Sequence, residues 1–211
     1  MRKAGSVRLS VADEAPWSST GVFHWEQSRT AELVRKRDYD DAQFAMRMVD
    51  RAFYVGQSGS GWARVPLGAA SEEESGPADR GAAQIAVFWV IDPLFQLDVH
   101  GRLGSVVRKG DEKVDGAPAV HYRSTVENSA FVSAIGDDLP AARRDAVQLA
   151  LELRGATVAA DFWIGPGGEV LKMAVDLPTQ RDGSTAVRYS DYGRAAAVQA
   201  PPPAEILNPN G

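Results

Sequence analysis

Residues 105–126 read SVVRKGDEKVDGAPAVHYRSTV, and this stretch decides the fold. It holds two extended segments joined by Asp115-Gly116, a dipeptide that accepts the positive φ angles of a tight hairpin turn. The same arrangement occurs twice more, at residues 158–177 around Gly165-Pro166-Gly167-Gly168 and at residues 178–198 around Asp182-Gly183. A row of antiparallel hairpins forms a curved sheet, and curved sheets often enclose something apolar.

The N-terminal half has the alternation of polar and apolar residues that is typical of half-buried strands. Val7, Leu9 and Val11 alternate with polar residues almost from the first residue of the chain. Five strands are predicted in this half, at Gly5–Ala12, Thr20–Arg29, Ala31–Arg37, Gln43–Val49 and Ala52–Val55.

Two helices interrupt the predicted strands. Asp92-Pro93 is typical of a helix N-terminus and predicts a helix from Pro93 to about Arg102. Asp137, Asp138 and Pro140 predict the start of a second helix that ends at Gly155. Residues 84–91 are a short apolar run that periodicity assigns equally to strand or helix. Residues 1–211 are therefore predicted to be a single α+β domain dominated by antiparallel sheet.

Composition limits the functional classes. The 211 residues include 23 basic and 28 acidic side chains, a net charge of −5 that argues against a nucleic-acid partner. The absence of cysteine excludes disulfides, thiolate metal sites and a cysteine nucleophile. No apolar stretch is long enough to span a membrane. No apolar segment follows Met1-Arg2-Lys3, so a secretory signal is not expected in this chain.

The chain shows no catalytic or metal-binding motif. The three histidines are scattered, so we interpret them as structural or surface residues: His24, His100 and His121. The Gly/Ser stretch at 56–61 lacks the Lys-Ser/Thr of a phosphate loop and the spacing of a nucleophile elbow. The acidic clusters at 72–74 and 137–138 are typical of a solvated loop and of a helix N-terminus. We expect no catalytic residue, no metal site and no cofactor, and the chain is predicted not to be an enzyme.

Aromatic and methionine side chains are the better candidates for function. They can be the core between sheet and helices, or they can line a cavity that accepts apolar ligands, for which methionine is well suited. The candidates for an apolar ligand-binding cavity are Phe44, Met46, Met48, Phe88, Trp89, Phe95, Phe162, Ile164, Leu171 and Met173.

Several motifs resemble a known family. Residues 107–116 (VRKGDEKVDG) and 120–126 (VHYRSTV) are similar to the G-x-E-x-V-D-G-x-x-x-x-H-Y hairpin of exported actinobacterial lipoproteins. Residues 161–170 (DFWIGPGGEV) resemble their V-x-V-W-I-D-x-x-G-x-V hairpin. The closing Y-x-D-Y-G-x-x-V-x-x-P pattern resembles Tyr189–Gly193 with Val198–Pro201. These are lipoproteins of the LppX/LprG type, within the LolA/LolB/RseB-like superfamily.

The resemblance implies a strongly curved antiparallel sheet, an unclosed half-barrel, with helices packed on its concave face. It implies a non-enzymatic protein of the cell envelope that binds or carries a lipid or another hydrophobic ligand. The alternative on the same fold is a sensor or protein-interaction module like RseB, with a protein partner. A hydrolase is a third possibility, for which no residue spacing argues.

The chain departs from the family in three ways. It has neither a signal peptide nor a lipid-modified cysteine, no helix is predicted before the first strand, and Gly165 stands where the family often has aspartate. The resemblance therefore implies an extracytoplasmic protein that is membrane-associated in its native precursor, through a signal and anchor absent from this chain.

Overall fold

The structure is a computed structural model. It describes residues 4–12, 17–26, 29–37, 43–57, 60–65, 87–139, 141–152, 155–176 and 184–207. The acidic cluster at 72–74 and the predicted Asp182-Gly183 turn lie outside the described residues. The chain divides into two compact units, residues 1–66 with 187–211 and residues 67–186, each of which is described by itself. The single domain expected over residues 1–211 stays a prediction.

The first unit contains six strands in chain order. They are β1 (Ser6–Ala12), β2 (Trp17–His24), β3 (Thr30–Arg37), β4 (Gln43–Val49), β5 (Ala52–Gln57) and β6 (Gly61–Val65). Each pairs antiparallel with the next in a simple meander. The β4–β5 connection is a two-residue turn in which Asp50 and Arg51 have φ angles of 49° and 63°. This is the handedness that matches twisted strands, here achieved without glycine.

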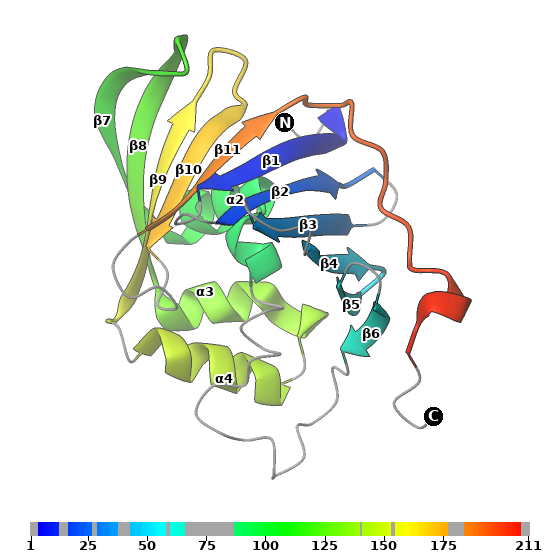
Figure 1. The fold of residues 1–211 in the computed structure, drawn as a ribbon. Helices are drawn as coiled ribbons and strands as arrows, with labels where there is room; N and C mark the ends of the chain where they lie inside the picture. Colours follow the sequence, from blue (N-terminus) through cyan, green and yellow to red (C-terminus); the bar gives the residue numbers. More distant parts are fainter. Residues whose placement is uncertain are drawn as a thin grey trace. The chain divides into compact units, whose positions relative to one another are not determined.

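A C-terminal segment extends over the first unit after β11 (Ser184–Ser190), as Figure 1 shows in orange and red. The Ala195 amide donates to the Ser6 hydroxyl and the Val198 amide donates to the Thr30 hydroxyl, at 3.1 and 3.2 Å. Further on, the Leu207 amide donates to the Trp62 carbonyl at 2.7 Å. Three backbone amides, among them that of Val198 in the Val198–Pro201 motif, therefore bind this segment to the strands.

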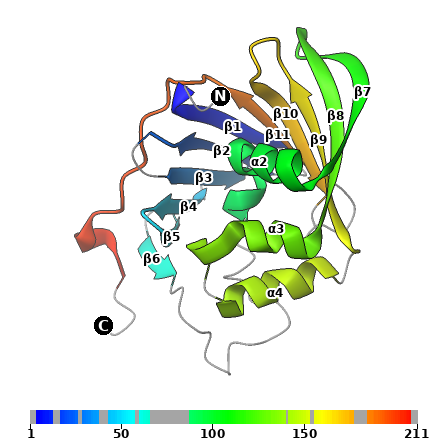
Figure 2. The same ribbon diagram turned by 180° about the vertical axis from the view of Figure 1, so that it is seen from behind.

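The second unit contains the helices and the four remaining strands. They are α2 (Pro93–Leu103), β7 (Ser105–Val114), β8 (Ala117–Glu127), α3 (Asn128–Ile135), α4 (Ala141–Glu152), β9 (Thr157–Ile164) and β10 (Val170–Asp176). Helix α2 contacts β7 and β8, α3 contacts β8 and β9, and α4 contacts β9. Helices α3 and α4 also pack side by side, as both Figure 1 and Figure 2 show.

The strands follow the hydrogen-bonded order β6-β5-β4-β3-β2-β1-β11-β10-β9-β8-β7. Every register described is antiparallel, and the order ends at β6 and β7 without closing. The predicted fold class, α+β with a large open antiparallel sheet, is confirmed.

Local sequence signals explain the start of α2 and the β7–β8 turn. Asp92 caps α2, because its side chain accepts hydrogen bonds from the amides of Leu94 and Phe95 at 2.8 and 3.1 Å. Asp115 and Gly116 have the predicted positive φ angles, 50° and 86°, in the β7–β8 turn.

Two elements differ from the sequence-based expectation, because strand β6 and helix α3 were not predicted. Within the apolar run, which the sequence left open between strand and helix, residues 87–90 form a helical turn. Helix α3 was missed because it directly continues a strand: Glu127 ends β8, and the helix begins at Asn128 with no side-chain cap.

Candidate functional site

An apolar row crosses five strands of the first unit. Val7, Phe23, Ala31, Met48 and Phe53 stand opposite one another on β1 to β5. Each of these side chains is at most 4 % exposed. Directly opposed residues share one face of a sheet, so the row is a continuous buried strip.

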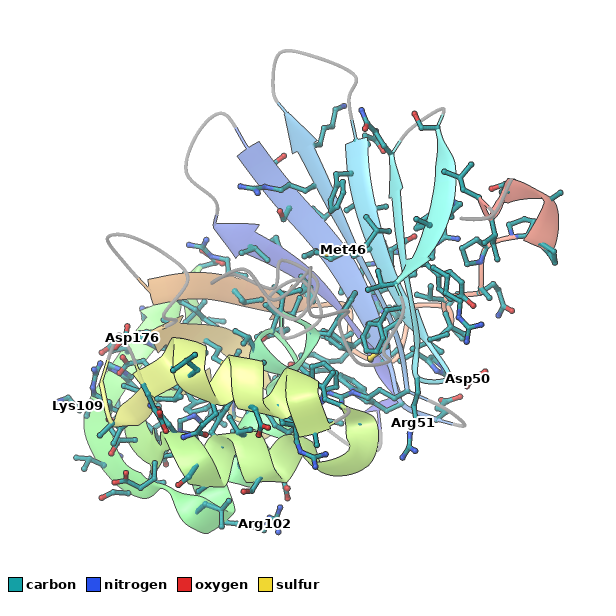
Figure 3. The ribbon with its side chains drawn as sticks, turned by 90° about the horizontal axis from the view of Figure 1, so that it is seen from below. Met46, Asp50, Arg51, Arg102, Lys109 and Asp176 are labelled. Carbon is teal, nitrogen blue, oxygen red and sulfur yellow. The ribbon has the colours of Figure 1, made fainter. Side chains whose placement is uncertain are left out.

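The same face continues along β4 toward less covered positions. Met46 stands opposite Leu33 and Val55, and Phe44 lies one pair further along β4. Leu33 is buried, whereas Phe44, Met46 and Val55 are half-buried. Figure 3 shows Met46 within the strand, away from the turn that holds Asp50 and Arg51. The apolar surface of this face therefore extends beyond its fully buried part.

The second unit has an apolar face of its own. Phe162 on β9 stands opposite Met173 on β10, and these side chains are 3 % and 0 % exposed. Helix α2 contributes Val99, which is fully buried, and His100, whose ring meets the Phe162 ring edge-on at 5.4 Å. Of the predicted candidates, Phe162 and Met173 are therefore direct neighbours.

The other candidates of this unit lie in varied surroundings. Phe88 and Trp89 are buried in the helical turn at 87–90, and Ile164 is half-buried at the end of β9. Phe95 is half-buried and meets Phe131 of α3 edge-on at 5.6 Å. The register of β10 shifts between Val170 and Lys172, which places Leu171 at a bulge rather than in the row of Met173. The ligand-binding role of all ten candidates stays a prediction.

A polar pair interrupts the core of the second unit. Gln96 and His100 lie one helical turn apart on α2 and are 0 % and 1 % exposed. The Gln96 amide nitrogen donates to the Trp89 carbonyl at 3.0 Å. The Gln96 carbonyl oxygen and both ring nitrogens of His100 have no hydrogen-bond partner among the described residues. Burial lowers the pKa of His100 from 6.5 to about 4, so its ring is neutral at pH 7.

From the sequence, His100 is interpreted as a structural or surface histidine, and Gln96 is not among the candidate residues. The available signal was their spacing of four residues on a predicted helix, which places two polar side chains on one face.

The motif residues of the β7–β8 hairpin meet on the opposite face of the second unit. The two ring nitrogens of His121 lie 2.8 Å from Glu112 and 2.8 Å from Asp161, and the ring stacks on Trp163 at 4.4 Å. The Trp163 indole donates to Glu112 at 2.7 Å. Arg123 bridges Asp161 to Asp176, which ends β10 and is labelled in Figure 3.

This polar cluster joins β7, β8, β9 and β10. Hydrogen bonds from the Trp163 indole and the His121 ring hold the pKa of the Glu112 carboxyl below its ordinary value of 4.5. Because carboxylates engage both nitrogens of His121, the ring has no free lone pair with which to activate a nucleophile. These motif side chains therefore bind one another across four strands.

The described residues contain no group of three or more His, Asp or Glu side chains placed to hold a metal ion. Among the same residues, no helix combines the length and apolar character needed to cross a membrane.

Comparison with known proteins identifies relatives in fold and in sequence. No family model matches the chain. A Streptomyces griseus protein, described as an uncharacterized 31.2 kDa protein in the rplA-rplJ intergenic region, is 30 % identical over 108 residues. That match covers 50 % of this chain and 35 % of the relative, so the chain aligns with about a third of the relative's length.

Two solved structures share the fold. The lipoprotein LppX of Mycobacterium tuberculosis is 14 % identical, with a TM-score of 0.51 over 92 % of this chain and 90 % of LppX. LprF of Mycobacterium bovis is 15 % identical, with a TM-score of 0.50 over 93 % of this chain and 89 % of LprF. The chain therefore has the fold of LppX and LprF, as the hairpin motifs predicted.

Proposed function

We propose that this chain binds a lipid or another apolar ligand and carries out no covalent chemistry. The observation that carries the proposal is the half-buried strip of Phe44, Met46 and Val55, which continues a fully buried apolar row on the same sheet face. An apolar face that is not fully covered can gain free energy by receiving an acyl chain. Methionine is suited to such a surface because its flexible side chain adapts to ligands of different shape.

The hydrophobic contribution alone is large enough for useful affinity. Burying about ten methylenes contributes roughly 8 kcal/mol, before the entropic cost of association is subtracted. A chain of that length can therefore be held without a charged contact, which agrees with the apolar character of the strip.

We also propose that the protein acts in the cell envelope. The support is its fold, which it shares with a protein described as a lipoprotein. The buried faces of both units are apolar apart from a few polar side chains. The polar cluster around His121 is engaged by its own hydrogen bonds, which supports binding rather than catalysis.

The test is titration of the purified protein with N-phenyl-1-naphthylamine, an uncharged probe that fluoresces in apolar surroundings. We expect saturable binding that a C16 or C18 lipid displaces. The variant Met46→Trp fills the strip and is expected to weaken binding about tenfold or more, the loss of roughly two buried methylenes of contact.

Gln43→Trp is the matched control. Gln43 is an exposed residue on the same strand and the opposite face, so the same added bulk there is expected to leave probe binding unchanged. Absence of saturable binding in the wild-type protein, or equal binding by wild type and both variants, would contradict the proposed site.

A further inference from the structure

The unpartnered polar atoms of α2 set the second unit's core apart from an ordinary apolar core. The Gln96 carbonyl oxygen and both ring nitrogens of His100 are fully buried, with no partner among the described residues. Buried polar atoms in folded proteins almost always have partners, because an unpaired one loses its hydration without replacement. Three such atoms on one helix face point to a group that the protein receives from outside.

The surroundings of the pair identify which atoms are available. The Gln96 amide nitrogen is already engaged by the Trp89 carbonyl, which fixes the amide orientation and leaves its oxygen as an acceptor. The His100 ring stands edge-on to Phe162 on β9, whose cross-strand neighbour is Met173. The polar atoms are therefore adjacent to Phe162, one of the residues predicted to line an apolar cavity.

The chemistry of these atoms limits the ligand. A neutral imidazole has one donor nitrogen and one acceptor nitrogen, so the pair together provides one donor and two acceptors. The acidic side chain at the start of the helix, Asp92, is engaged by the amides of Leu94 and Phe95. A charged headgroup would thus lack a compensating charge from the pair itself, whereas a hydroxyl can donate to one acceptor and accept from the ring N–H.

We propose that Gln96 and His100 bind an uncharged hydroxyl group on an otherwise apolar ligand. This inference rests on the proposed function and adds to it the chemical class of the ligand, a hydroxylated chain rather than a plain hydrocarbon or a carboxylate. In this view the polar pair selects among ligands, and the apolar side chains beside it in the same unit, Phe162 and Met173, supply the apolar contacts.

The experiment compares three ligands of equal chain length in displacing N-phenyl-1-naphthylamine: 1-decanol, decane and decanoate at pH 7.5. For the wild-type protein we expect 1-decanol to bind about tenfold more tightly than decane, the effect of one well-made hydrogen bond to otherwise unpaired groups. Decanoate should bind no more tightly than decane.

Two variants test whether Gln96 and His100 cause the preference for 1-decanol over decane. His100→Phe keeps an aromatic ring against Phe162 but removes both nitrogens, and Gln96→Met keeps the side-chain length but removes the acceptor. Each is expected to lower the preference for 1-decanol below about threefold while retaining the binding of decane. Leu103→Ala, a change at an exposed position on α2, is the control and should retain the full preference.

The outcomes separate this inference from the proposed function. Equal binding of 1-decanol and decane by the wild-type protein overturns the inference, while saturable binding of either ligand still supports the proposed function. An unchanged preference in His100→Phe and Gln96→Met overturns the assignment to this pair. Failure of the wild-type protein to bind any of the ligands or the probe overturns both proposals.

Discussion

The lowered pKa of the buried His100 on α2 predicts how the free energy of unfolding changes with pH. Burial lowers the pKa of His100 from 6.5 to about 4 in the folded protein, whereas the unfolded chain retains the value near 6.5. Below pH 6.5 the unfolded state therefore binds a proton at His100 that the folded state does not bind, so acid favours unfolding. The difference between these two pKa values corresponds to about 3 kcal/mol of unfolding free energy.

The sign and the pH window follow from these two values. The His100 contribution is absent above pH 6.5, grows as the pH falls from 6.5, and is complete near pH 4. Because the side chain is 1 % exposed, solvent screening does not reduce the effect appreciably. His100→Phe has no titrating group at this position, so it should lose less stability than the wild type over the same window.

The assay is urea unfolding followed by tryptophan fluorescence at pH 7.5, 6.0, 5.0 and 4.0, without ligand. We compare the free energies of unfolding of His100→Phe and wild type at each pH. The other histidines and the carboxylates titrate in both proteins, so their contributions cancel in this difference. We expect this difference to shift by about 3 kcal/mol in favour of the variant between pH 7.5 and pH 4.0. A difference that is constant with pH, or that shifts in favour of the wild type, would refute the reasoning.

Further predictions concern individual contacts. Glu112→Gln should lower the free energy of unfolding at pH 7. Because the Glu112 pKa is lowered in the folded state, the difference in unfolding free energy from wild type, measured with urea, should disappear as the pH falls below 4.5. A difference that persists at that pH contradicts the lowered pKa of Glu112. Asp92→Ala removes the cap of α2 and should cost about 1 kcal/mol in thermal unfolding, with Asp92→Asn as the control that retains the acceptor; equal losses in both would argue against capping. Arg51 has a positive φ angle of 63°, which is strained for a residue with a side chain, so Arg51→Gly should raise the free energy of unfolding by about 1 kcal/mol. A lower free energy of unfolding would show that contacts of the Arg51 side chain stabilise the protein by more than the backbone strain costs.

Strong local signals made much of the fold predictable. Gln43–Val49 matches β4 at both ends because the alternation there is uninterrupted, and Asp115-Gly116 forms the predicted turn because few dipeptides accept two positive φ angles so readily. The short strand β6 lacked such a signal, since its sequence GWARV offers little alternation. Residues 87–90 were ambiguous because a short apolar run suits a buried strand and a buried helix equally well.

The candidate site was predictable only where strand alternation persisted. The candidates Phe162 and Met173 stand opposite each other because β9 and β10 pair regularly at these residues. Strict alternation along β10 would put Leu171 on the same face as Met173, but the bulge between Val170 and Lys172 interrupts the alternation there. The polar pair of α2 escaped prediction because nothing in a single sequence shows that a histidine lacks hydrogen-bond partners.

The central claim is that the apolar faces of this chain accommodate a lipid or another apolar ligand. The most direct measurement is native mass spectrometry of the protein purified without detergent from a Streptomyces or Mycobacterium host, followed by lipid analysis of the organic extract. We predict a stoichiometric apolar ligand on the wild-type protein and its loss from Met46→Trp but not from Gln43→Trp. A wild-type protein at its bare polypeptide mass in independent preparations, with no lipid in the extract, would contradict the claim.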